Sequence, residues 1–189
     1  MDVVSAYFAG AIDADGYITL SAKLGHRPRR DGTKPIYFTV KVGLSQTEPI
    51  VPALLFETFG GWTGIYKPRN PKHKLVHLWS VQNLKAEEPL RALLPHLRLK
   101  KEHARLCLEF IGLLQAQNQG RFMAIRITDE QLGQRLRLYQ AVAGLNQVRN
   151  RRRFRDLAAG VPEALLAVRT GLHHSCASSQ ALAPAPPLS

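Results

Sequence analysis

Two segments alternate between polar and apolar side chains, and this alternation constrains the fold more than any other feature. In residues 17–25, Tyr17, Thr19, Ser21 and Lys23 alternate with Ile18, Leu20, Ala22 and Leu24. Residues 36–45 repeat the pattern, with Tyr37, Thr39, Lys41 and Gly43 set against Phe38, Val40, Val42 and Leu44. A period of two is that of a strand with one buried face. Two such strands joined by the basic turn 26–35 predict a long β-hairpin with one polar face.

Helices and a second hairpin are expected around this one. We expect helices at 4–14, 48–59, 84–95, 101–117, 128–144 and 161–171, and further strands at 62–69 and 74–81. Thr47 is expected to cap the helix 48–59, and Thr128 with Gln131 is expected to form a capping box at the start of the helix that runs to about Gly144. The order α-β-β-α-β-β-α, with helices after it, predicts an α+β fold. Its two hairpins form one four-stranded antiparallel sheet with a concave polar face, and helices cover the other face.

The composition excludes several classes of protein. The chain of 189 residues has a formal net charge of +12 and only two cysteines, Cys107 and Cys176, which excludes a disulfide scaffold and a four-cysteine zinc site. No apolar run reaches the roughly 18 residues of a membrane span. The N-terminus lacks the basic region of a secretory signal, so we expect an intracellular protein. One domain is expected over 1–172, with its core at about 4–117, helices and a basic loop at 118–172, and a disordered tail at 173–189.

The positive charge is gathered in two places. Residues 19–82 hold ten Lys or Arg residues against three acidic ones, and Arg149, Arg151, Arg152, Arg153 and Arg155 form a second cluster. An isolated arginine cluster is equally well explained as a solvated loop. Two basic regions together favour contact with the phosphates of a nucleic acid.

The segment FAGAIDADG, residues 8–16, ends the first helix with two acidic residues, Asp13 and Asp15. Anions are unfavourable at a helix C-terminus, where the last carbonyls already carry partial negative charge. Such a placement suggests a compensating cation, and carboxylate and carbonyl oxygens are the ligands that Mg²⁺ prefers. From these residues alone, an ordinary Asx-type turn is the simpler interpretation. An EF-hand is excluded, because its register would place Ala11 and Ala22 where acidic ligands are needed.

The nonapeptide FAGAIDADG matches seven of the nine letters of LAGLIDADG, and the chain resembles the single-motif, homodimeric branch of the LAGLIDADG homing endonucleases over about residues 5–158. The two hairpins, Ser45-Gln46, the loop 95–100 and Leu145-Asn146 with the basic loop follow in the expected order. The resemblance implies a saddle-shaped sheet. It also implies an Mg²⁺-dependent, site-specific endonuclease that hydrolyses both DNA strands across the minor groove and leaves short 3′ overhangs.

The resemblance also implies roles for individual residues. Asp15 is the metal ligand and catalytic carboxylate, the Ala14 carbonyl is a second ligand, and Mn²⁺ or Ca²⁺ can occupy the same sites. Gln46 orders active-site water, and Lys100 stabilises phosphate charge or lowers the pKa of a water. The alternatives are a polar strand end for Gln46 and a solvated loop lysine for Lys100. Asp13 helps to end the helix. Ile50 stands where the family often has a basic residue, so the outer part of the active site departs from the pattern.

The implied partners are a second copy of the chain and a pseudo-palindromic double-stranded DNA of about 20 base pairs. The motif helices pack across the dyad through Phe8, Ala9, Ala11 and Ile12. The expected DNA contacts are Thr19, Ser21, Lys23, Tyr37, Thr39, Lys41, Lys67, Arg69, His77, Trp79, Arg149, Arg151 and Arg152. For His77 and Trp79, the buried face of the last strand is an open alternative.

Two other functions compete with this one. A non-cleaving intron RNA maturase or DNA-binding regulator on the same scaffold is the closer alternative. A general RNA-binding protein would leave the acidic helix end unexplained. An intron-encoded enzyme of this kind is expected in an organelle or in a prokaryotic cytoplasm.

Overall fold

The computed structural model describes residues 2–27, 32–70, 72–118 and 127–146. The elements follow in the order α1 (Val3–Asp15), β1 (Gly16–Leu24), β2 (Ile36–Gln46), α2 (Ile50–Phe59), β3 (Trp62–Tyr66), β4 (Val76–Gln82), a 3-10 turn η1 (Asn83–Ala86), α3 (Glu87–Leu93), α4 (Lys101–Asn118) and α5 (Asp129–Leu145). The expected α+β order is therefore confirmed. The arginine cluster 149–155, the helix expected at 161–171 and the tail lie outside the described residues.

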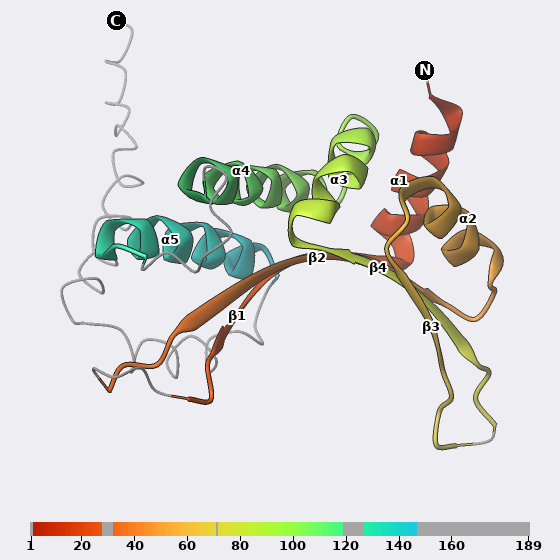
Figure 1. Cartoon of the computed structure of the whole chain (residues 1–189). Helices are drawn as coiled ribbons and strands as arrows, with labels where there is room; N and C mark the ends of the chain where they lie inside the picture. The colour runs from red at the N-terminus through yellow and green to blue at the C-terminus, as the bar shows by residue number, and fades with distance from the viewer. Residues whose placement is uncertain (1, 28–31, 71, 119–126, 147–189) are drawn as a thin grey trace, which may run out of the picture.

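The four strands form one antiparallel sheet in the order β1-β2-β4-β3. Figure 1 shows this sheet as an arch, with the helices on its convex side and the β1–β2 and β3–β4 hairpins reaching down on either side of a hollow. The helices α4 and α5 contact β1, while α1 contacts β2 and α2 contacts β4. The saddle shape implied by the resemblance is confirmed.

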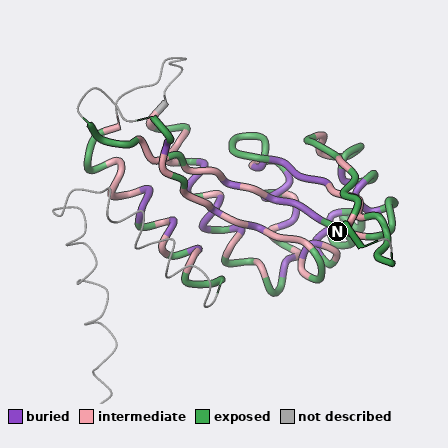
Figure 2. Tube along the Cα trace, turned by 90° about the horizontal axis from the view of Figure 1, so that it is seen from below, coloured by how far each residue is buried: buried purple, intermediate pink, exposed green. Residues whose placement is uncertain are grey.

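The core lies between the sheet and the helices, because the apolar half of each alternating segment faces them. Val40, Val42 and Leu44 of β2 are completely buried, and Ile18 and Leu20 of β1 lie beside them. Figure 2 shows buried positions along the middle of the molecule and exposed positions at the ends of the hairpins. The period-two pattern therefore predicted the inner and outer faces of the first hairpin correctly.

The helix α1 enters the sheet through a turn that requires a glycine. The Gly16 backbone N–H donates to the Ile12 carbonyl and ends the helix. A Cβ atom at Gly16 would lie 2.7 Å from Ile12 Cα and 2.9 Å from the Gly43 carbonyl oxygen, distances that real Cβ atoms do not reach. The close approach of helix and strand places the last turn of α1 against β1 and the inner strand β2, where Gly16 is opposite Leu44.

Three expected boundaries were wrong for local reasons. The helix α2 begins at Ile50 with Pro49 at its N-cap, and Thr47 does not cap it. A proline disfavours the helical conformation at the preceding residue, which is consistent with a helix that begins after Pro49 rather than at Glu48. The segment expected as one helix at 84–95 is divided into η1 and α3, since Pro89 lacks the N–H that a continuous helix needs there. The strand β3 ends at Tyr66 rather than at residue 69.

The capping box at the start of α5 is confirmed, because the Thr128 side chain accepts from the Gln131 N–H and the Gln131 side chain accepts from the Thr128 N–H. Within the described part of the chain, no helix has the length and apolar composition needed to cross a membrane.

Candidate active site

The last turn of α1 brings together Asp15 and Gln46, which are 31 positions apart in the sequence. The Gln46 Nε2 donates a hydrogen bond of 2.9 Å to Asp15 Oδ2. Asp15 is otherwise exposed, with one carboxylate oxygen free of this bond. Because Gln46 ends β2, the strand that runs through the middle of the arch fixes the orientation of the carboxylate. The structure therefore brings together two residues to which the resemblance assigns roles in the active site.

Asp13 holds the loop before α4, rather than only ending its own helix. Its Oδ2 accepts from the backbone N–H groups of Arg98 at 2.6 Å and Leu99 at 3.1 Å, and its Oδ1 accepts from that of Lys100 at 2.9 Å. Partial burial opposes ionisation of Asp13, but these backbone donors and the nearby Lys100 charge lower the pKa of its carboxyl group below the ordinary value. Asp13 is therefore ionised at neutral pH.

Lys100 lies with its ammonium group against the end of α1. Its Nζ donates to the Ile12 carbonyl oxygen at 2.9 Å and also to the Asp13 carbonyl oxygen. The last carbonyls of a helix are the negative end of its dipole, so a lysine here is favourable. The Lys100 ammonium group therefore supplies part of the positive charge that the acidic end of α1 was expected to need, immediately before Asp15.

The donor set of this site fits half of a divalent-metal site. Asp15 offers an exposed carboxylate, and Ala14, also exposed in the last turn, has the backbone carbonyl that was expected as a second ligand. No group of three His, Cys, Asp or Glu side chains able to hold a metal occurs among the described residues. Oxygen donors of this kind suit Mg²⁺, which proteins usually bind through one or two carboxylates together with substrate phosphates and several waters, so the Asp15 carboxylate of one protomer supplies only part of the ligands.

The concave face of the first hairpin carries six of the expected DNA contacts as three cross-strand pairs. The register places Thr19 opposite Lys41, Ser21 opposite Thr39 and Lys23 opposite Tyr37. Directly opposed residues of an antiparallel pair lie on the same face, so these six side chains form one polar surface. Lys41 Nζ also lies 5.5 Å from the centre of the Tyr17 ring, and this cation–π contact adds Tyr17 to the surface.

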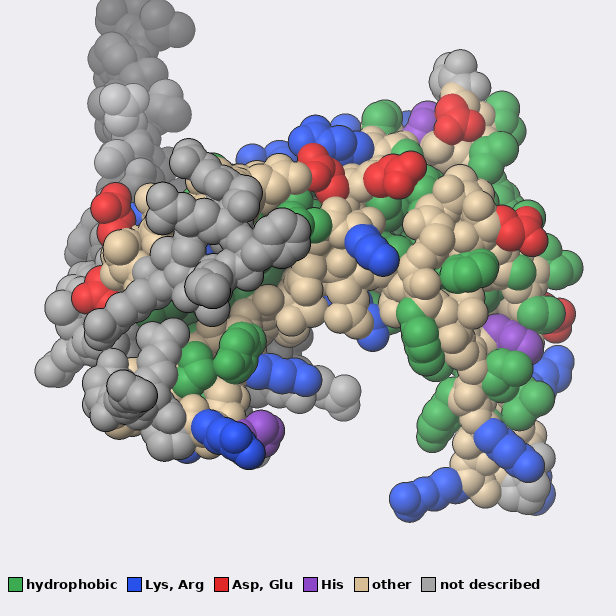
Figure 3. Space-filling model, viewed as in Figure 1, with side chains coloured by type: hydrophobic (Ala, Val, Ile, Leu, Met, Phe, Trp, Pro, Cys, Tyr) green, Lys and Arg blue, Asp and Glu red, His purple; other side chains and the backbone are tan. Residues whose placement is uncertain are grey.

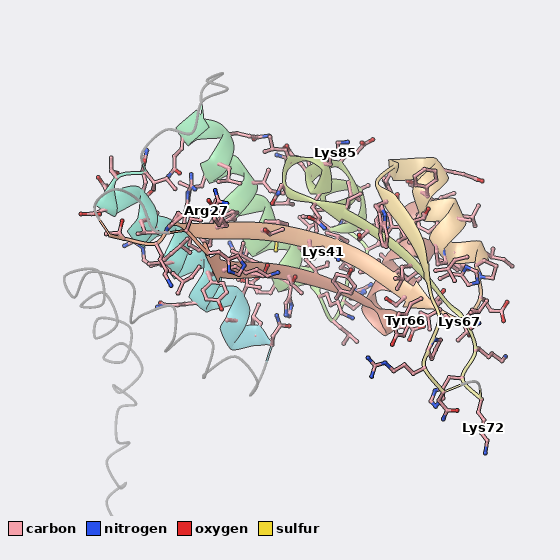
Figure 4. The ribbon with its side chains drawn as sticks, turned by 60° about the horizontal axis from the view of Figure 1, so that its bottom comes forward. Arg27, Lys41, Tyr66, Lys67, Lys72 and Lys85 are labelled. Carbon is pink, nitrogen blue, oxygen red and sulfur yellow. The ribbon has the colours of Figure 1, made fainter. Side chains whose placement is uncertain are left out.

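Basic side chains occupy both sides of the hollow. Lys23, Arg27 and Lys34 are exposed toward the end of the β1–β2 hairpin, and Lys67, Arg69, Lys72 and Lys74 toward the end of the β3–β4 hairpin. Figure 3 shows Lys and Arg groups at both lower tips, and Figure 4 places Lys41 between them on the sheet. The described positions of the concave face include no Asp or Glu. Positive side chains therefore lie on both sides of the hollow and, at Lys41, on the sheet between them.

The expectation that Trp79 contacts DNA was wrong, whereas the expectation for His77, which is half-buried, stays a prediction. In the sheet register Leu44 is opposite Trp79 and Gln46 is opposite His77, which places both side chains on the helix-covered face. Trp79 is completely buried, and its Nε1–H donates to the Gly60 carbonyl at 2.8 Å. The strand β4 has apolar residues in both parities, so its own sequence does not define its buried face.

The same register exposes residues that sequence reasoning missed. Trp62, Tyr66 and Gln82 lie on the concave face, since Trp62 is opposite Ser80, Tyr66 is opposite Val76 and Gln82 is opposite Lys41. Trp62 is 57% exposed, and its ring lies over Gly64, where a Cβ atom would come within 2.4 Å of it. Figure 4 places Tyr66 at the start of the hairpin that carries Lys67 and Lys72.

The face of α1 expected to meet a second copy was also assigned wrongly in part. Phe8, Ala9 and Ile12 are buried in their own protomer, where the Phe8 ring centroid is 6.0 Å from that of Phe59. Ala11 is half-buried against the same core. The exposed face carries Val3, Val4, Ala6, Tyr7, Gly10 and Ala14 instead. Both faces of α1 are apolar, so the helix sequence did not show which one the sheet would cover.

The remaining expected positions are accounted for as follows. Ile50, in place of a basic residue, is the first residue of α2 and is exposed. Lys67 and Arg69 lie in the loop after β3 rather than in the strand. Arg149, Arg151 and Arg152 lie outside the described residues.

Comparison with known proteins identifies the fold. No protein-family model and no curated protein matches the sequence. Solved structures do match: the homing endonuclease I-CvuI in complex with the I-CreI target is 22% identical with a TM-score of 0.58, covering 79% of this chain and 85% of that one. The archaeal intron-encoded homing endonuclease I-Vdi141I, complexed with DNA, is 18% identical with a TM-score of 0.56, covering 76% and 84%. The homing endonuclease I-TnaI is 12% identical with a TM-score of 0.57, covering 86% and 100%.

The chain therefore has the fold of the homing endonucleases, which is the family that its FAGAIDADG segment resembles.

Proposed function

We propose that the protein is a homodimeric endonuclease that cuts double-stranded DNA at a specific site. The observation that carries this proposal is the placement of an exposed carboxylate, Asp15, hydrogen-bonded to Gln46 at the end of the inner strand β2 of an arch whose concave face is basic. I-CvuI and I-Vdi141I, which share the fold, have been captured in complex with DNA.

The concave face has the chemistry that duplex DNA requires. A two-stranded ribbon fits the major groove, and the pairs Thr19–Lys41 and Ser21–Thr39 would present donors, acceptors and methyl groups to base edges. The lysines and arginines at the two hairpin ends would neutralise phosphates on either side of the duplex. In this arrangement the sheet reads the sequence and the hairpin ends fix the position of the DNA.

Cleavage is proposed to take place where the ends of two α1 helices meet. Two Asp15 carboxylates, the Ala14 carbonyls and a DNA phosphate would together supply the oxygen ligands that one protomer lacks. Bound Mg²⁺ supplies Lewis-acid stabilisation of the phosphate charge and of the leaving 3′ oxygen. Gln46 holds the Asp15 carboxylate and offers its carbonyl oxygen to a water, while Lys100 reduces the negative potential at the helix end. Hydrolysis of both strands would leave short 3′ overhangs.

The dimer is proposed to form through the exposed face of α1. Val3, Val4 and Tyr7 present apolar side chains there, and Gly10 and Ala14 are small enough to let a second helix approach closely. A Cβ atom at Gly10 would meet nothing within 4 Å, so Gly10→Leu fits the protomer but obstructs the partner. We expect wild type to sediment as a dimer and Gly10→Leu as a folded monomer. A monomeric wild type with DNA bound, or a dimeric Gly10→Leu protein, would contradict this interface.

The test of the enzymatic function is cleavage of the gene's uninterrupted flanking sequence, placed in a plasmid. We expect wild type to linearise the plasmid in Mg²⁺ and to nick or cut no plasmid that lacks the site. Asp15→Asn is expected to bind the same DNA without cutting it. Glu88→Gln serves as the matched control, because it removes an exposed carboxylate of α3 and leaves the site intact.

Two outcomes would refute the proposal. Cleavage by Asp15→Asn at the wild-type rate would show that Asp15 is not the catalytic carboxylate. Tight binding of intron RNA, with no cleavage of any DNA site by the wild type, would favour the maturase function instead.

A further inference from the structure

The ionised Asp13 side chain has no part in the chemistry proposed above, although it makes more backbone contacts than any other carboxylate near the site. Its two oxygens accept from three successive backbone N–H groups, those of Arg98, Leu99 and Lys100. These groups are 85 to 87 positions further along the chain, so the contact is a tertiary tie between the end of α1 and the start of α4.

Asp13 is not needed to end its own helix. The Gly16 N–H already donates to the Ile12 carbonyl, and the close approach of Gly43 to Gly16 sets the direction of the chain there. The carboxylate is therefore free to act on the loop. Three charge-assisted hydrogen bonds to consecutive amides leave this loop little freedom to move.

The loop that Asp13 holds carries Lys100 directly to the α1 terminus. The Lys100 backbone N–H is bonded to the Asp13 carboxylate, and its side-chain Nζ returns to the Ile12 and Asp13 carbonyl oxygens. Backbone and side chain of one lysine are thus fixed by adjacent groups of α1. A lysine has four side-chain torsions and adopts a single position only when its backbone is also held.

We propose that Asp13 is a positioning residue, which acts on cleavage through Lys100 by fixing the loop of residues 98–100. In the cleaving complex the helix end faces a second Asp15 and a phosphate, so the negative charge there increases. Lys100 held against the carbonyls that precede Asp15 offsets this charge, and a Lys100 released to solvent does not. This inference rests on the proposed endonuclease function.

The first test measures the loop without reference to activity. Hydrogen exchange of the Arg98, Leu99 and Lys100 amides is compared between wild type, Asp13→Ala and the control Glu88→Gln. We expect exchange at these three amides to rise roughly 10- to 100-fold in Asp13→Ala, from the loss of charge-assisted hydrogen bonds, and to stay unchanged in the control. Unchanged exchange in Asp13→Ala would overturn the proposal, whatever the protein does to DNA.

The second test is a double-variant cycle in single-turnover cleavage at saturating DNA. Asp13→Ala and Lys100→Met are each expected to slow cleavage about 10- to 100-fold, while the Kd for DNA changes less than about threefold. The double variant is expected to be no slower than Lys100→Met alone, because Asp13 has nothing left to position. Asp13→Asn, which keeps one carbonyl acceptor but loses the charge, should fall between wild type and Asp13→Ala, and it serves as the reference if Asp13→Ala fails to fold.

The outcomes separate the possible failures. Losses that multiply in the double variant would show that Asp13 acts independently of Lys100. Faster amide exchange with unchanged cleavage would show that Asp13 only holds the backbone before the start of α4 and does not act on cleavage. A wild type that cuts no DNA would refute the endonuclease function, and this further inference with it, even if the exchange data confirm the contact between Asp13 and the loop.

Discussion

The two tryptophans of the chain lie on opposite faces of neighbouring strands, and replacing each of them tests the register of the sheet. Trp79 is completely buried beneath the helices, and Trp62 is exposed on the concave face. We expect Trp79→Ala to destabilise the protein without any specific effect on DNA binding. Trp62→Ala is expected to do the opposite.

The magnitude for Trp79 follows from its burial. A buried tryptophan removes about 150–250 Å² from water, which at about 25 cal/mol per Å² corresponds to about 4–6 kcal/mol. Measured Trp→Ala substitutions in cores cost about 3–5 kcal/mol. The lost Nε1–H bond also leaves the Gly60 carbonyl without its donor, a change of about 1 kcal/mol. We therefore expect a loss of about 4–5 kcal/mol, and a Tm lower by about 8–20 °C for a chain of this length.

Urea denaturation followed by circular dichroism measures this loss, since the signal does not depend on the tryptophan removed. Such a loss is a large part of the 5–15 kcal/mol that stabilises most domains, so Trp79→Phe provides a milder variant. It keeps an aromatic ring beside Phe59 but cannot donate to Gly60, and we expect a loss of about 1–3 kcal/mol. Trp62→Ala should change stability by less than about 1 kcal/mol and weaken DNA binding at least about fivefold.

The opposite pattern would refute the register. If Trp79→Ala or Trp79→Phe weakens DNA binding while the free energy of unfolding stays at the wild-type value, Trp79 faces the hollow. The pairing of β4 with β2 would then be shifted by one residue, which moves every side chain of β4 to the other face.

Three further predictions concern the thiol, the charge and a helix cap. Burial raises the pKa of the Cys107 thiol to about 12 from 9.0, so iodoacetamide should modify Cys107 only after unfolding. Because the unfolded chain releases this proton first, stability should fall as the pH rises from about 9 towards 12, and Cys107→Ala should reduce that dependence in urea titrations at several pH values. Lys67→Ala is expected to reduce the slope of log Kd against log salt by about 1.8 for a dimer, if each Lys67 at the end of the β3–β4 hairpin neutralises one phosphate; an unchanged slope would mean that Lys67 contacts no phosphate. Thr128→Ala should lower the free energy of unfolding by about 1 kcal/mol through loss of the α5 cap, and a neutral effect in urea would show that α5 does not unfold with the core.

Local pattern was sufficient for the parts of the fold in which one periodicity dominates. The alternation in residues 17–25 and 36–45 predicted both faces of the first hairpin, because only one parity of each segment is apolar. The capping box at Thr128 predicted the start of α5 for the same local reason. The FAGAIDADG motif identified Asp15 as a candidate site residue. The resemblance in the order of the later segments added Gln46 and Lys100, and the structure places all three residues at the end of α1.

The errors occurred where a segment offers two apolar faces. In β4, Leu78 and Trp79 are neighbours of opposite parity, and pairing with Leu44 assigned Trp79 to the core. In α1, both Val4-Tyr7 and Phe8-Ile12 make plausible apolar faces, and the position of Phe59 assigned Phe8 to the protomer core. The part played by Asp13 was not predictable either, because its partners lie more than 80 positions away.

The amino-acid sequence therefore specifies the alternating strands, the acidic end of the first helix and the excess of positive charge, since each of these depends on residues that are neighbours in the chain. Long-range packing specifies the rest: which apolar face is covered, which tryptophan is exposed, and how Asp13 brings Lys100 to the carbonyls before Asp15. Both faces of an ambiguous element gain free energy on burial, and only the complementary surface across the core selects between them.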